Sequence, residues 1–273
     1  MRSSCEPLAV VAPPKSCGSS QPSCFRLEED SKHQPFPDSG SGPLSSQMNL
    51  TLLKLKRAIG PEADGEVYAY VVETVKPQKG SRSVLQEGSG PNFQGGRITL
   101  CTCKHSMRAG SHPSKWRGRW IAGFSSKGNG QPQRLFYLMR IERTFESHNE
   151  MWNALEAEVT KAKSMHTNRL GDVCQPRPNI PPGAEFDPVN YFLPRKDHVH
   201  IFKNGWHKDL NKDYQKDRKH RAALLLGAAN ASFLWALPSL ALRGVGDDYR
   251  TRTKGCFKTK SLSDFLDQLV EIR

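Results

Sequence analysis

The chain has 273 residues, enough to bury a core in one large domain or in two small ones. Its 40 Lys and Arg residues outnumber 27 Asp and Glu residues, giving a net charge of +13. Such an excess is typical of proteins that bind an anionic partner, such as nucleic acid, an anionic membrane or an acidic protein, and it also fits a charge that serves only solubility. The longest apolar stretch, 222–242, is interrupted by Gly227, Asn230 and Pro238, so the sequence predicts no membrane span.

The first 48 residues differ in composition from the rest. They are crowded with Ser, Pro and Gly and hold few residues that could pack, which predicts disorder. They carry four Lys or Arg and five Asp or Glu, a net charge of −1, which leaves 36 − 22 = +14 for the remainder. We therefore expect a disordered leader at 1–48 and a single basic domain at 49–273.

Cysteine usage bears on the compartment. Seven is an odd number, and three of the seven, Cys5, Cys17 and Cys24, lie in the leader, so a disulfide scaffold is not expected. The first residues also lack a continuous apolar segment of the kind that directs secretion. These features indicate an intracellular protein, located in the cytoplasm or, in a eukaryote, in the nucleus.

The early part of the domain predicts mostly strands. Segment 50–59 fits either a helix or an edge strand, 66–75 fits a strand, and 76–96 has the composition of a long surface loop. Three apolar runs bounded by Gly, Pro, Ser and Lys then predict consecutive strands, at 98–103, 120–124 and 135–141. Gly-Asn-Gly between the last two runs indicates that these strands are antiparallel neighbours.

Helical signals follow. Ser147 and Glu150 form a capping-box pattern, and the apolar periodicity after them predicts a helix to about residue 162. Six prolines in 168–194 predict an irregular segment, and 261–272 has the periodicity of a terminal helix. The element order predicts an α+β fold with a small, curved, mixed or mostly antiparallel sheet, partly closed and flanked by helices.

The turn at 91–96 and the segment after it form the first candidate site. Gly95 and Gly96 permit close approach of the backbone to a ligand, while Lys104 and Arg108 offer a compact cation and a bidentate fork suited to phosphate. The same residues fit a solvated turn with ordinary surface cations. No phosphate loop, nucleophile elbow or H-E-x-x-H motif is present, which weakens an enzymatic function without excluding it; the catalytic residues stay unknown, and we expect no cofactor.

A second candidate site lies at 198–209. His198, His200 and His207 could ligate a metal, and Trp206 could stack on a base. Such histidines are more often solvated or hydrogen bonded to backbone than bound to metal, and core packing of Trp206 is as compatible with the segment as stacking. Cys101-x-Cys103 is more typical of small buried residues than of a zinc site, because further ligands are missing from the spacing.

The segment from Tyr68 to about Trp152 resembles a known family. The motifs P-N-F-x-G-G-x-I-T-L-C-T-C-K-x-x-x-R, G-R-W-I-A-G and L-F-Y-L-M-R-I-E-R-T-F are similar to those of the nucleotide modification associated domain 2 family, found mainly in bacteria and phages. The resemblance is weaker beyond Phe186. The matching positions are Pro91, Asn92, Gly95, Thr99, Cys103, Lys104, Arg108, Trp120, Gly123, Tyr137 and Arg140. Arg119 replaces the family's Asp and His105 its Pro, which removes a carboxylate but leaves anion binding possible.

The resemblance implies an architecture akin to small PUA-like barrels and an association with modified nucleobases. We therefore predict a domain that binds DNA, RNA or a nucleotide, with a basic face on phosphate and an aromatic residue on a base. Two alternatives stay open: an enzyme acting on a modified base or nucleotide through the histidines, and a protein-interaction module with an acidic partner. The predicted binding residues are Asn92, Gly95, Lys104, Arg108, Arg119, Trp120, Tyr137, Arg140 and Trp206.

Overall fold

The computed structural model describes residues 33–34, 44–60, 64–87, 91–126, 132–164, 173–192, 220–243 and 257–272. All of them belong to the second of two units into which the chain divides, 31–273. Most of the predicted leader lies outside the described residues. Leu44 and Met48, at its end, are buried in the core beside the short 3-10 helix η1 (Ser45–Gln47).

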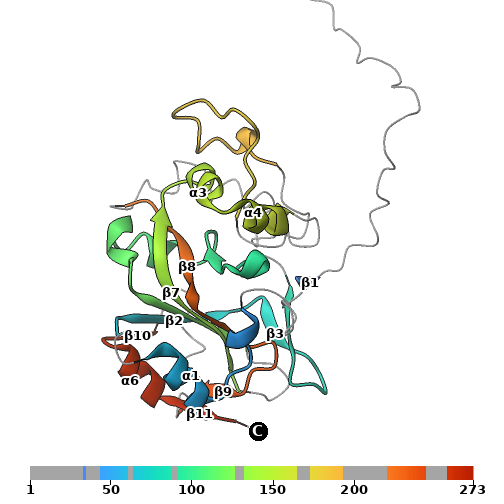
Figure 1. The fold of residues 1–273 in the computed structure, drawn as a ribbon, viewed down its shortest axis with the longest axis vertical. Coiled ribbons are helices and arrows are strands. Elements are labelled where there is room, and N and C mark those ends of the chain that lie inside the picture. The colour runs from blue at the N-terminus through green and yellow to red at the C-terminus, as the bar shows by residue number, and fades with distance from the viewer. Residues whose placement is uncertain are drawn as a thin grey trace, which may run out of the picture. The chain divides into compact units, whose positions relative to one another are not determined.

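A six-stranded mixed sheet is the centre of the fold, with the order β10-β2-β6-β7-β8-β5 (Figure 1). β2 and β6 are parallel, and the other neighbouring pairs are antiparallel. The strands are β2 (Val67–Val72), β5 (Thr99–Leu100), β6 (Trp120–Ser125), β7 (Leu135–Phe145), β8 (Leu224–Leu234) and β10 (Phe257–Thr259). Two small sheets accompany it, in the orders β1-β4-β3 and β11-β9, formed by β1 (His33–Gln34), β3 (Val75–Pro77), β4 (Val84–Glu87), β9 (Leu240–Leu242) and β11 (Leu269–Glu271).

Helices α1 (Leu52–Ile59) and α6 (Leu262–Asp267) cover one face of the sheet. Leu55 of α1 and Phe265 of α6 pack with Trp120 and Leu138, whose side chains alternate with those of the opposite face. Thr51 and Ser261 cap the two helices through their side-chain oxygens. Figure 1 shows these helices at one end of the view and α3 (His148–Ala154) and α4 (Ala157–Ser164) at the other, with the sheet between them.

The opposite face is covered by short segments between the strands. Buried Phe93 and Trp116 pack with Tyr70, Ile121 and Tyr137 on this face. The short elements around them are η2 (Gln94–Gly96), α2 (His105–Arg108) and η3 (Pro113–Trp116), and η5 (Pro188–Asn190) lies in the proline-rich segment.

The α+β class and the mixed sheet are confirmed. The predicted strands at 66–75, 120–124 and 135–141 correspond to β2, β6 and β7, and β6 and β7 are antiparallel neighbours as Gly-Asn-Gly indicated. Segment 50–59 contains a helix, α1. None of the sheets formed by the described residues closes into a barrel.

Two strand predictions were wrong. The supposed loop at 76–96 contains the hairpin of β3 and β4, whose Val75 and Val84 are buried in the core. The run at 98–103 gives only the two residues of β5, which pairs with β8 and not with β6. The hairpin is a local pairing, whereas the pairing of β5 depends on a strand distant in sequence.

Two helix predictions also need correction. The helix after Ser147 ends at Leu155, whose extended backbone (ψ 150°) separates α3 from α4. The predicted terminal helix at 261–272 stops at Asp267, because the chain then pairs as β11 with β9. The cap of α6 is Ser261, whose Oγ accepts a hydrogen bond from Asp264 N.

Candidate functional site

A group of charged and aromatic side chains gathers at the start of β2, and we call it the Glu66 cluster. It comprises Glu66, Tyr68, Trp116, Arg119 and Lys258. Sheet register explains the gathering, because Lys258 lies opposite Tyr68 in the antiparallel β10–β2 pair. The parallel β2–β6 pair places Trp120 beside Val67, and the residues before them, Arg119 and Glu66, follow the same alignment.

Glu66 bridges the two cations of this cluster. Its Oε2 lies 2.9 Å from Nε of Arg119, and its Oε1 lies 2.6 Å from Nζ of Lys258. The hydrogen bond from Lys258, followed by the charges of Arg119 and Lys258, holds the pKa of the Glu66 carboxyl below its ordinary value. The same hydrogen bond raises the pKa of Lys258. Lys258 therefore stays charged across the physiological pH range.

The aromatic rings hold these cations in place. Arg119 Cζ lies 5.4 Å from the ring centre of Tyr68 and 5.2 Å from that of Trp116, and Lys258 Nζ lies 5.0 Å from the Tyr68 ring. Such contacts are worth about 0.5–1 kcal/mol at exposed sites. Arg119 also donates to Ser111 Oγ at 3.2 Å. Its orientation is therefore fixed before any ligand binds.

Exposed cations surround the cluster. Lys115 and Arg117 are exposed on η3 and just after it, and Lys260 is exposed directly after β10. The chain between β5 and β6 that carries the first two has no acidic residue. The cluster and its neighbours therefore form a positively charged surface, to which Glu66 contributes a single carboxylate shared by two cations.

Arg108, predicted to bind phosphate, is in the interior. Only 1% of the residue is exposed. Its Nε donates to the carbonyl of Cys103 at 2.7 Å, and its Nη1 donates to the carbonyls of Ala222 at 3.2 Å and Ala223 at 2.7 Å. The guanidinium therefore ties α2 to the chain entering β8. This position does not favour contact with a ligand.

Lys104 lies nearer to the surface. It has a left-handed backbone (φ 56°) immediately before α2, and its Nζ is 5.3 Å from the ring centre of Tyr70. Because Tyr70 follows Tyr68 on the same face of β2, Lys104 extends the row of cations along that strand.

Helix α4 packs directly against the turn that holds Asn92 and Gly95. The buried Lys163 donates to Oδ1 of Asn92 at 2.9 Å and to the Arg97 carbonyl at 2.8 Å. Gly95 has φ +73°, and an added Cβ would lie 2.8 Å from Cα of Val159. The glycine thus allows close approach, as expected, but the approaching group is the backbone of α4.

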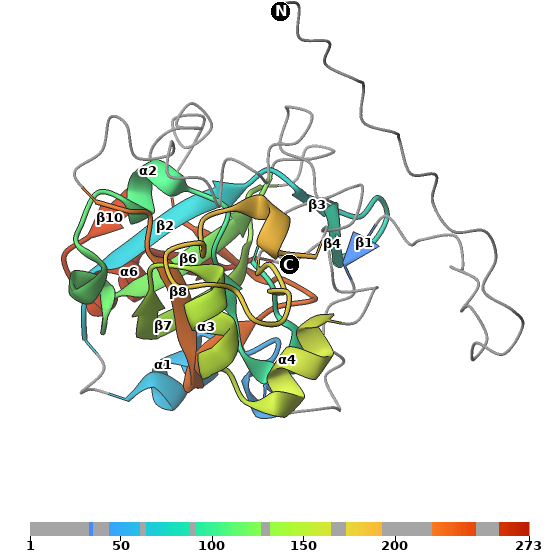
Figure 2. The same cartoon turned by 90° about the horizontal axis from the view of Figure 1, so that it is seen from above.

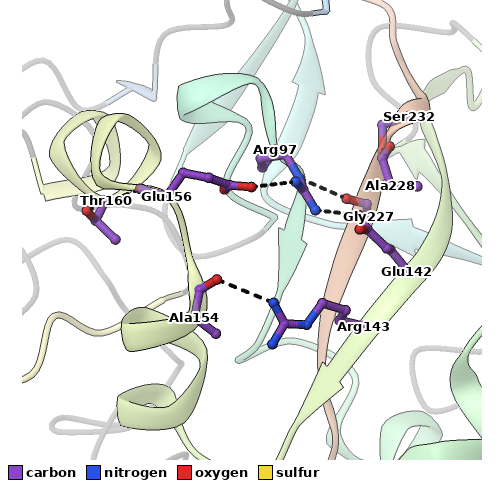
Figure 3. Close-up of polar contacts among 9 residues, drawn as sticks. All are labelled: Arg97, Glu142, Arg143, Ala154, Glu156, Thr160, Gly227, Ala228 and Ser232. Carbon is purple, nitrogen blue, oxygen red and sulfur yellow. Dashed lines mark hydrogen bonds and ion pairs between the residues drawn. The ribbon is translucent and has the colours of Figure 1, made fainter.

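Arg97 secures the same turn from its other end (Figure 3). It forms ion pairs with Glu142 of β7 and with Glu156 before α4, the latter at 3.2 Å, and its Nε donates to the Gly227 carbonyl of β8 at 3.3 Å. Figure 3 also shows Arg143, from the same strand as Glu142, donating to the carbonyl of Ala154. The turn at 91–97 is therefore a junction between η2, the sheet and the helices, rather than an open cradle.

The remaining predicted residues are spread apart. Trp120 and Tyr137 are fully buried on opposite faces of the sheet, and the Tyr137 hydroxyl is 2.8 Å from that of Tyr70. Arg140 is half-buried opposite Trp120 in the β6–β7 pair. Of the predicted set, the structure brings Arg119 into the Glu66 cluster and leaves Lys104 beside the same strand.

Several predictions lie outside the described residues: Trp206 and the histidines His198, His200 and His207. Among the residues that the structure describes, no group of three or more His, Cys, Asp or Glu side chains could hold a metal ion. The described helices include none with the length and apolar character needed to cross a membrane.

Sequence reasoning missed four members of the cluster: Glu66, Tyr68, Trp116 and Lys258. Trp116 carried a signal, because it interrupts a run of cations at 115–119, a pattern of interleaved aromatic and basic residues. Lys258 carried none, since its place beside Tyr68 depends on a strand pairing across most of the domain. Comparisons of the chain with protein-family models, with curated proteins and with solved structures found no match.

Proposed function

We propose that this protein binds nucleic acid, and that the Glu66 cluster with its flanking exposed cations contacts the phosphate backbone. The observation that supports this most directly is the position of Arg119 and Lys258, two cations held on aromatic rings beside one carboxylate. A phosphate can take the place of Glu66 as their anionic partner without any rearrangement of the rings. The proposal keeps the class of partner implied by the resemblance to the nucleotide modification associated domain 2 family.

The cluster favours phosphate over base contacts. Trp116 is fully buried, and the Tyr68 ring is contacted by Arg119, Lys258 and Trp116. These rings therefore orient cations and offer no open face for stacking on a base. Phosphate contacts carry little sequence information, so we expect binding that depends strongly on salt and weakly on sequence.

An intracellular location, in the cytoplasm or nucleus, belongs to the same proposal. Nucleic acid is abundant there, and an odd number of cysteines, three of the seven in the leader, fits a reducing compartment. The association with modified bases stays a prediction, which oligonucleotides carrying modified bases would test within the titrations described next.

The direct test is a fluorescence-anisotropy titration of labelled DNA and RNA oligonucleotides at several salt concentrations. Lys115→Glu with Arg117→Glu should weaken binding to all sequences and reduce the magnitude of the salt slope by about 2, one for each lost phosphate contact. Lys54→Glu with Arg57→Glu makes the same charge change on α1, whose Leu55 packs against the other face of the sheet, and should weaken binding less. Equal effects of the two pairs, or no binding to any oligonucleotide at low salt, would refute the proposal.

Glu66→Gln should change the affinity for nucleic acid in the opposite direction. Removing the carboxylate frees Arg119 and Lys258 from their ion pairs, so affinity should rise while the fold is kept. A simple loss of structure would lower affinity, so a gain separates a binding role of the cluster from a structural one. The reading is the dissociation constant at fixed salt, with the unfolding transition as the control.

A further inference from the structure

The hairpin of β3 and β4 is a second strongly basic feature, at the other end of β2 from the Glu66 cluster. Lys76, Lys79 and Arg82 are exposed on it, and the sequence from 75 to 86 contains no acidic residue. Its turn is internally bonded: Gln78 N donates to the Ser83 carbonyl at 2.9 Å, and Gly80 supplies φ +72°. The cations therefore project from a defined turn.

The base of the hairpin is anchored in the core. Val75 and Val84 are buried, Ser126 N donates to the Val75 carbonyl at 2.7 Å, and Val84 N donates to the Ala236 carbonyl at 3.4 Å. The short strand β1 pairs with β4 only at Gln86 and Glu87, far from the turn. Figure 1 shows the hairpin reaching beyond the six-stranded sheet, so its tip is a two-stranded ribbon presented on a rigid base.

The two basic features lie along one line. β2 runs six residues from the Glu66 cluster to the turn that enters β3, which is about 20 Å at the usual rise of a strand. Lys104 lies over Tyr70 between them. Figure 2 shows α2, which begins directly after Lys104, above β2, with β10 toward one end of that strand and β3 at the other. A ligand that contacts the cluster and the base of the hairpin must therefore span about 20 Å, or about six base pairs of a duplex at 3.4 Å per pair, and the tip of the hairpin lies beyond that base.

Duplex DNA fits this surface better than the other nucleic acids. A two-stranded β-ribbon fits the major groove of B-DNA, which is about 12 Å wide, whereas the major groove of RNA duplexes is too narrow. Single-stranded binding relies on exposed aromatic rings, and no aromatic side chain whose burial the structure describes is in the exposed class.

We propose that the β3–β4 hairpin enters the major groove of double-stranded DNA whose backbone lies against the Glu66 cluster. The inference rests on the proposed function and names its substrate. Lys79 and Arg82 lie at the tip and contact phosphates or base edges in the groove, while the cluster holds the backbone at the other end of β2.

The test compares three double variants on a 20-base-pair DNA duplex by fluorescence anisotropy: one at the hairpin, one on α1, and Lys115→Glu with Arg117→Glu beside the cluster. Lys79→Glu with Arg82→Glu should weaken binding by about 10- to 100-fold at 0.1 M salt. Each phosphate contact contributes about 0.9 log unit of affinity at 0.1 M relative to 1 M salt, and two contacts are lost. Lys54→Glu with Arg57→Glu on α1 is the matched control for net charge. Unfolding curves of all variants should coincide with the parent, because these side chains are exposed.

Dimethyl sulfate protection identifies the groove, since the reagent methylates guanine N7 in the major groove and adenine N3 in the minor groove. The parent should protect N7, and the hairpin variant should lose that protection. If the hairpin variant binds like the α1 control, or if N7 stays fully reactive, this inference is wrong while the Lys115 and Arg117 result still decides the proposed function. Tighter binding to single-stranded DNA or to duplex RNA also overturns it.

Discussion

Replacing Arg108 by Met should destabilise the protein by about 3–5 kcal/mol, because buried backbone carbonyls lose the charged donor that they bond. The guanidinium is buried and donates to three backbone carbonyls, those of Cys103, Ala222 and Ala223. Methionine keeps most of the side-chain length and removes every donor. The change therefore isolates the hydrogen bonds from the packing.

The magnitude follows from those contacts. A hydrogen bond from a charged group contributes about 1.5–3 kcal/mol, and bonds that share one side chain do not add fully. The two 2.7 Å bonds, to Cys103 and Ala223, should dominate over the 3.2 Å bond to Ala222. With ordinary stabilities of about 5–15 kcal/mol, the variant loses a large share of the total.

Urea unfolding monitored by tryptophan fluorescence measures the effect as a shift of the midpoint. Arg117→Met is the matched control, because Arg117 is exposed and should change stability by less than about 0.5 kcal/mol. At temperatures where Arg108→Met stays folded, its salt slope for DNA should equal that of the parent. A variant as stable as the control but with a reduced salt slope would refute the reasoning and return Arg108 to the phosphate-binding surface.

Three further substitutions test the fold around the site. Gly123→Ala should lower the melting temperature sharply or prevent folding, because the added Cβ would lie 1.9 Å from Cε1 of Tyr137. Lys163→Met should cost about 2–4 kcal/mol in urea unfolding, since Asn92 and the Arg97 carbonyl lose a buried donor. Burial raises the pKa of Tyr191, so its contribution to stability is complete below about pH 10 and is lost as pH rises further; Tyr191→Phe should flatten stability curves measured between about pH 9 and 11.

Local pattern was sufficient where neighbours in sequence are neighbours in space. Alternating β-branched and aromatic residues predicted β2, β6 and β7, and the glycines between the last two predicted their antiparallel pairing. Local pattern was insufficient where a strand distant in sequence determines the pairing. β5 pairs with β8, and the helical periodicity after Ser261 gives way to β11 because β9 offers it a partner.

The candidate site shows the same limit. The basic segment before β6 was visible in the sequence, and Arg119 was among the predicted residues. Its partners could not be found from spacing, because Glu66 and Lys258 reach it through two strand pairings. Exposure could not be read from residue type either, since an arginine can satisfy several carbonyls in the interior as well as a phosphate at the surface.

The net charge of the protein therefore overstates the number of cations that can contact a ligand. Arg108 and Lys163 contribute to the net charge of +13, but their side chains donate hydrogen bonds to backbone and amide oxygens in the interior. Among the residues that the structure describes, the exposed cations that we assign to a polyanion are those at the hairpin tip and around η3, at opposite ends of one strand. Burial divides the basic residues into those that hold the fold and those that bind. Buried substitutions should therefore change the unfolding midpoint at a constant salt slope, and exposed ones the salt slope at a constant midpoint.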